Sequence, residues 1–62
     1  MVTLIVNDLH DVSRLELMLA TKRIPFVVEL ASDSEALNPP YLLVDGVPLD
    51  ETRAIKWMEE YK

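Results

Sequence analysis

The chain has 62 residues, 50% of them hydrophobic, and eleven acidic against six basic residues give a net charge of −5. This length suits one domain spanning residues 1–62, and the acidic balance excludes nucleic acid as a partner, because phosphate binding needs lysine and arginine. With no cysteine and one histidine, we expect no disulfide, no zinc site and no cofactor. No apolar run approaches the roughly 18 residues of a membrane span and no signal peptide is visible, which predicts a cytoplasmic protein without membrane contact.

The first predicted elements are a strand and a helix. Residues 2–6 read VTLIV, a β-branched apolar run typical of a strand buried on both faces. We expect the helix to begin with Asp8 or Asp11 as its N-cap and to end at Lys22-Arg23, where cations suit a helix C-terminus. A helix turns by about 100° per residue, and at this spacing Leu17 lies outside the apolar stripe of the predicted helix. The stripe itself consists of Leu9, Val12, Leu15, Met18 and Leu19.

The second half predicts a strand, a hairpin and a final helix. Residues 26–30 (FVVEL) form the second strand, parallel to the first because a helix joins them, and residues 31–38 leave room for one helical turn at most. Asp45-Gly46 between apolar residues 41–44 and 47–49 indicates a type I′ hairpin. Pro48 has no amide hydrogen, so the last strand belongs at an edge.

The final helix is amphipathic and begins with Asp50 or Thr52 as its cap. Its expected apolar side consists of Ala54, Ile55, Trp57, Met58 and Tyr61. We expect the two aromatic residues to belong to the core and not to a ligand site. The order β-α-β-β-β-α predicts an α/β chain of the α+β two-layer type, with a four-stranded mixed sheet.

At this point the sequence resembles a known family. Residues 40–49 read PYLLVDGVPL: a proline, a short apolar strand, an Asp-Gly turn and an apolar residue before the last helix. This spacing is similar to the second half of glutaredoxins, within the thioredoxin fold, and residues 19–30 resemble the end of their first helix and their second strand. In proportions the chain looks like the short glutaredoxin-like hydrogen donors of ribonucleotide reductase. The resemblance implies a cis peptide bond before Pro40.

Three departures from the family remove its chemistry. The redox motif Cys-x-x-Cys or Cys-x-x-Ser falls on Leu9-His10-Asp11-Val12, so no thiolate is present to attack a disulfide. The Gly-Gly that receives glutathione falls on Asp50-Glu51, whose carboxylates would repel that anion. The family's helix between the second and third strands is reduced to residues 31–38. We therefore expect no oxidoreductase activity and no enzyme function.

Two surfaces are candidates for binding a partner. Leu9, Val12 and Leu17 form either an apolar contact surface, where the family keeps its cysteines, or part of the core. The segment Asn38-Pro39-Pro40-Tyr41 corresponds to the family's contact with extended peptides or glutathione, although Pro39 has no amide to donate. The alternative for these prolines is that they only set the entry to the strand.

The pair His10-Asp11 is a weaker candidate at the same place. Together they form the pattern of a general base. However, no cysteine nucleophile accompanies them, and a helix N-terminus disfavours a charged imidazole. A solvated histidine beside a capping aspartate is the favoured interpretation, and we predict no catalytic residue.

These observations predict a redox-inactive glutaredoxin-like protein that binds another protein, of the kind that a virus or mobile element encodes as an accessory factor. Two alternatives stay open. The first is a relative of glutathione-dependent or thioredoxin-fold oxidoreductases with residual ligand binding. The second is a structural homodimer formed through the helix face or an edge strand.

Overall fold

A computed structural model describes residues 1–10, 13–32 and 37–61 of the chain. The helices and strands follow one another as β1 (Val2–Val6), α1 (Arg14–Thr21), β2 (Val27–Leu30), β3 (Tyr41–Val44), β4 (Val47–Leu49) and α2 (Glu51–Glu59). The described residues contain no helix long and apolar enough to cross a bilayer. The order confirms the predicted alternation of elements, and the second strand begins at Val27, one residue later than we expected.

The four strands form one mixed sheet in the order β2-β1-β3-β4. Strand β1 pairs parallel with β2, with Val6 beside Leu30, and antiparallel with β3, with Ile5 beside Tyr41. Among the described residues, strand β4 pairs with β3 alone, which places Pro48 on an edge strand as predicted. The chain is therefore α+β with a four-stranded mixed sheet and two helices, as the sequence indicated.

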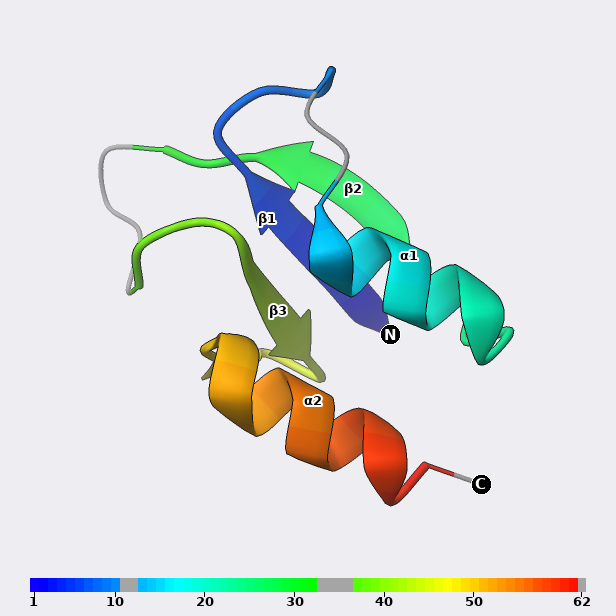
Figure 1. The fold of residues 1–62 in the computed structure, drawn as a ribbon. Coiled ribbons are helices and arrows are strands. Elements are labelled where there is room, and N and C mark those ends of the chain that lie inside the picture. The colour runs from blue at the N-terminus through cyan, green and yellow to red at the C-terminus, as the bar shows by residue number, and fades with distance from the viewer. Residues whose placement is uncertain (11–12, 33–36, 62) are drawn as a thin grey trace.

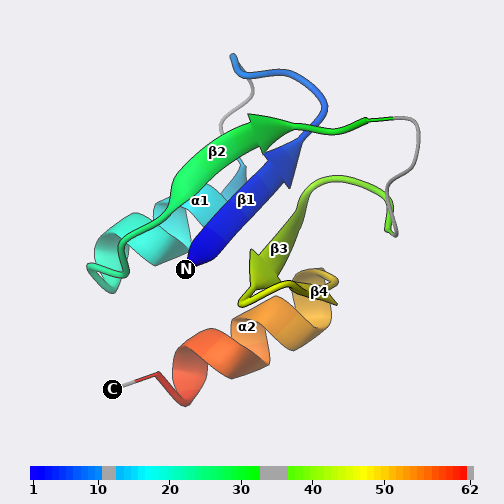
Figure 2. The same cartoon turned by 180° about the vertical axis from the view of Figure 1, so that it is seen from behind.

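Both helices cover the same face of the sheet (Figures 1 and 2). Alternate residues of a strand point to the same face, so Val2, Leu4 and Val6 of β1 all point toward the helices. Their core partners from α1 are Leu15 and Leu19, both fully buried. The remaining buried members of this core are Ile24, Leu42, Ala54 and Met58. Strand β1 is buried throughout, which confirms the prediction from its apolar sequence.

The β3–β4 hairpin turns at Asp45-Gly46 as predicted. Both residues have positive φ, 50° at Asp45 and 84° at Gly46, which is the requirement of a type I′ turn. The turn is also joined to the chain's first residue. The Met1 ammonium donates to Asp45 Oδ1 at 2.7 Å, and the Asp45 amide donates to the Met1 carbonyl at 3.1 Å. This ammonium lowers the pKa of the Asp45 carboxyl below its ordinary value of 3.8.

Helix α1 begins later than the sequence predicted. Its N-cap is Ser13, whose hydroxyl accepts from the Leu15 amide at 3.0 Å, so the expectation of Asp8 as the cap was wrong. Asp11 lies outside the described residues. The helix ends at Lys22 as predicted, and Arg23 follows with a φ of 59°. Serine competes well as a cap because its oxygen reaches the free amides of the first turn.

Two other expectations for the helices need correction. Leu9 precedes α1 and is 58% exposed, so it does not extend the buried stripe. Tyr61 follows α2 and is 44% exposed, and its ring lies 5.3 Å from that of Trp57. Trp57 packs against the core as predicted, whereas Tyr61 does not belong to the core cluster. Asp50 caps α2, accepting from the Arg53 amide at 2.9 Å.

Candidate functional site

One end of the sheet brings together segments that are distant in the sequence. Because β1 and β2 are parallel and β3 is antiparallel to β1, the ends of the first two strands lie beside the start of the third. The end of β4 joins them through the pairing of Leu49 with Leu42. This is the carboxyl end of the parallel strands, where open α/β sheets place their ligand sites. We call it the carboxyl edge, formed by residues 7–10, 31–32, 37–41 and 49–51 (Figure 1).

The loop after β1 presents Leu9 and His10 to solvent. Both side chains are exposed, and the His10 amide donates to Asp8 Oδ1 at 2.9 Å, which folds the loop back at this point. Asp8 therefore closes a turn before the helix instead of capping it. The predicted partner Asp11 and the candidate Val12 lie outside the described residues. Within the described part of the chain, no group of three metal-ligating side chains occurs.

The segment before β3 also lies at the carboxyl edge. The Pro39-Pro40 peptide bond is cis, in agreement with the implication of the glutaredoxin resemblance. Pro40 is exposed and Pro39 is half-buried, so their ring surfaces are accessible. Tyr41, the third candidate of this segment, is only 1% exposed, so its side chain is buried beside the two prolines. The sequence pattern could not show that Tyr41 is buried beside the exposed Pro40, because the side chain of a strand's first residue can point to either face of the sheet.

The end of β4 places two carboxylates at the same edge. Asp50 is committed to capping α2, and Glu51 lies 4.0 Å from Arg14 of α1 in an exposed ion pair. An exposed pair at that distance contributes little stability. Both carboxylates remain exposed, so this corner of the carboxyl edge presents negative charge.

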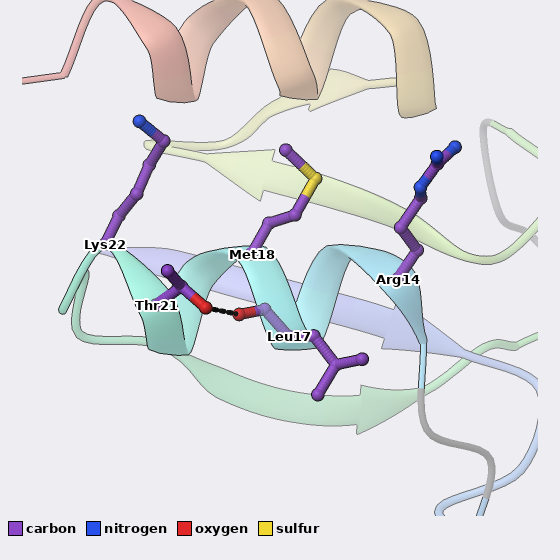
Figure 3. Close-up of a pocket in the computed structure, with 5 residues that line it drawn as sticks. All are labelled: Arg14, Leu17, Met18, Thr21 and Lys22. Carbon is purple, nitrogen blue, oxygen red and sulfur yellow. Dashed lines mark hydrogen bonds between the residues drawn. The ribbon is translucent and has the colours of Figure 1, made fainter.

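Leu17 lies on the outer side of α1, away from the core. It is 59% exposed, in agreement with its position off the apolar stripe. With its neighbours on α1 it lines a cavity of about 230 Å³, here called the α1 groove. Figure 3 shows Arg14, Met18 and Lys22 directed toward α2, whereas Leu17 points to the other side of α1. The groove residues are Arg14, Leu17, Met18, Thr21 and Lys22.

The α1 groove has an apolar floor with a cation at each end. Met18 is half-buried and packs against the core, and the Thr21 hydroxyl donates to the Leu17 carbonyl at 2.8 Å. That hydrogen bond uses the donor of the Thr21 hydroxyl and leaves its oxygen able to accept. Sequence reasoning identified Leu17 but missed the flanking Arg14 and Lys22, although their spacing of eight residues places them on one side of a helix.

Of the three exposed leucines among the described residues, Leu9 lies at the carboxyl edge, Leu17 on α1 and Leu30 at the end of β2. Comparison of the chain with protein-family models, with curated proteins and with solved structures finds no match. The site is therefore interpreted from its own residues.

Proposed function

We propose that this chain is a redox-inactive, glutaredoxin-like accessory protein that docks on another protein. The fold implied by the resemblance requires the first two strands to be parallel and all four strands to share one sheet. The strand order β2-β1-β3-β4 and its directions meet that requirement. These features support the proposed relationship.

The absence of thiols supports the loss of chemistry. Thiol–disulfide exchange needs a cysteine thiolate, and the chain contains no cysteine. Leu9 stands where the resemblance places the first cysteine of the motif, and it is 58% exposed. A leucine at that position exchanges a reactive group for an apolar contact. The conversion of a redox site into a recognition surface follows from that exchange.

The exposure of Leu9 and Leu17 is the observation that carries the proposal. Core leucines such as Leu15 and Leu19 are fully buried, so this small domain has enough interior to bury leucines. A single exposed leucine is ordinary on a protein surface, but Leu17 lines the α1 groove together with Met18, and apolar side chains grouped at a groove are typical of interaction sites. Burial of both leucines by a partner would contribute a few kcal/mol, about 1.5–3 kcal/mol for each fully buried side chain.

A capture experiment with the wild-type chain and two variants tests the proposal. The wild-type chain and the double variant Leu9→Ser/Leu17→Ser are used as baits, and Val47→Ser is the control, because Val47 is 57% exposed but lies on β4. We expect a partner that is retained by wild type and by the control and is lost from the double variant. Circular dichroism verifies that all three chains are folded.

Two results would contradict the proposal. A partner captured equally by all three chains would show that the exposed leucines do not form the docking site. Turnover of a disulfide substrate by the purified chain would refute the loss of redox chemistry. Sedimentation at two concentrations addresses self-association: a wild-type dimer that the double variant dissociates would assign the same leucines to a homodimer.

A further inference from the structure

The two edges of the sheet differ in how well they are protected. An exposed edge strand has unpaired backbone groups, and proteins guard such edges with prolines, charges or short strands. Strand β4 has three residues and carries Pro48 in its middle. Strand β2 has four residues, VVEL, without a proline, and no strand of the described chain pairs with its outer side. Figures 1 and 2 show β2 at the outer limit of the sheet from both sides.

The backbone groups that β2 offers can be assigned. The Ala31 amide donates to the Val6 carbonyl at 2.8 Å, so residue 31 faces β1. Successive residues of a strand direct their N–H and C=O groups to opposite edges. Val27 and Glu29 therefore face β1 as well, whereas Val28 and Leu30 direct one donor and one acceptor each to the open side. These four groups can hydrogen-bond to an added strand.

The side chains of β2 define what kind of strand fits. Val27 is 44% and Leu30 is 54% exposed, which gives apolar contacts on both faces of the sheet, and Glu29 between them is exposed and charged. In an antiparallel addition that uses Val28 and Leu30, Glu29 occupies a non-hydrogen-bonded position, where facing side chains come closest. The residue that faces Glu29 must then carry a positive charge.

The same charge disfavours a second copy of this chain. In the two-fold register that pairs Val28 with Leu30 of another copy, each Glu29 faces the other, and like charges in facing positions are destabilising. The net charge of −5 on each copy adds to that repulsion. A partner with a basic, β-prone segment has neither disadvantage.

An apolar cavity continues the edge at the amino end of β2. It has a volume of about 270 Å³ and is lined by Met1, Val2, Pro25, Phe26 and Val27. Strand addition usually combines main-chain hydrogen bonds with pockets that select side chains. An added strand that runs past Val27 brings its next apolar side chain beside this cavity.

The geometry points to the open edge of β2 as the place where a partner protein adds an antiparallel strand with a lysine or arginine facing Glu29. This inference rests on the proposed docking function and names a second contact for the same partner. We expect the partner's segment to be extended and basic and to direct an apolar residue toward the cavity.

Two synthetic peptides test the assignment by NMR on the full chain. They are acetyl-Thr-Val-Lys-Val-Thr-amide and the same peptide with glutamate in place of lysine, each titrated to millimolar concentration. We expect the lysine peptide to shift the amide signals of Val28 and Leu30 and to slow their hydrogen exchange, while the Val27 and Glu29 amides, already bonded to β1, change little. The glutamate peptide should bind about five- to tenfold more weakly.

Three variants make the test specific. Glu29→Lys, an exposed charge reversal, should invert the preference between the two peptides. Leu30→Pro removes the N–H of residue 30, which points outward and makes no hydrogen bond to β1. This variant should therefore abolish the response to both peptides. Val47→Thr on the opposite edge is the control and should leave the response unchanged.

Several outcomes would overturn the inference. The first is an equal or absent response to the two peptides, and the second is a set of shifts confined to residues 7–10 and the α1 groove. The third is protection of the Val28 and Leu30 amides that depends only on the chain's own concentration, which would assign the edge to a second copy. Failure of the docking function is a separate result. A partner lost from the Leu9→Ser/Leu17→Ser bait, in a complex that leaves both edge amides exchanging freely, would refute the edge and uphold the docking surface.

Discussion

The same leucine-to-alanine substitution should affect stability differently on the two faces of α1. Leu19 is fully buried in the core and Leu17 is 59% exposed, and they lie two residues apart in one helix. Replacement of either by alanine changes the intrinsic helix propensity slightly and by the same amount. Any difference between the variants Leu19→Ala and Leu17→Ala therefore reports tertiary packing.

The expected magnitudes differ several-fold. Leu19→Ala removes buried methyl groups and leaves a cavity among core side chains, which lowers the free energy of unfolding by about 2–5 kcal/mol. Leu17→Ala removes groups that already contact water, and its effect should stay within about 0.5 kcal/mol. A chain of this length has a total stability of about 3–9 kcal/mol, at roughly 0.05–0.15 kcal/mol per residue. The buried substitution therefore removes a large fraction of that stability.

Urea denaturation measures both variants against wild type. The chain has one tryptophan, Trp57, which packs against the core and serves as a fluorescence probe, with circular dichroism as a second probe. We expect a much lower midpoint for Leu19→Ala and an unchanged midpoint for Leu17→Ala, with similar slopes. Equal loss of stability in the two variants would refute the assignment of the buried face, and with it the claim that Leu17 is available to a partner.

Two further predictions concern the α2 cap and the hairpin turn. Asp50→Ala removes the acceptor that binds the Arg53 amide at 2.9 Å and should lower stability by about 1 kcal/mol in thermal unfolding, whereas Asp50→Asn should retain most of it; equal stability of wild type and the alanine variant would contradict the cap. The lowered pKa of Asp45 should appear in an NMR titration as a midpoint below 3.8, and acetylation of the Met1 amine should raise it. Because the folded-state pKa is the lower one, the ammonium contact stabilises the fold above the ordinary pKa and is lost as the pH falls through the lowered value. A midpoint at or above 3.8 in the unmodified chain would disprove that contact.

Local chemistry predicted most of the secondary structure. The run VTLIV at residues 2–6, the Asp45-Gly46 turn and the Asp50 cap all depend on residue types and spacings within a few positions, and each is confirmed. The start of α1 was predicted wrongly because Asp8 and Ser13 are both good caps. Sequence alone cannot decide which of these two residues caps the helix, because the choice depends on the path of the preceding loop.

Candidate site residues were harder to predict, because exposure is decided by the whole fold. Helical spacing separated the exposed Leu17 from the buried Leu15, but it also placed Leu9 on the apolar stripe, and Leu9 lies in the loop before α1 and is exposed. The sequence could not show whether Tyr41, beside two prolines, is exposed, and the structure buries it. The open edge of β2 was invisible in the sequence, because an apolar strand reads the same at an edge as in the middle of a sheet.

The sequence by itself determined the order of elements and the hairpin, since each depends on the identity of residues near one another in the chain. The tertiary structure decided which leucines contact water, which strand edge stays unpaired and which segments meet at the carboxyl edge. Those properties depend on contacts between residues far apart in sequence. A local sequence pattern therefore does not show whether another segment of the chain covers a given surface.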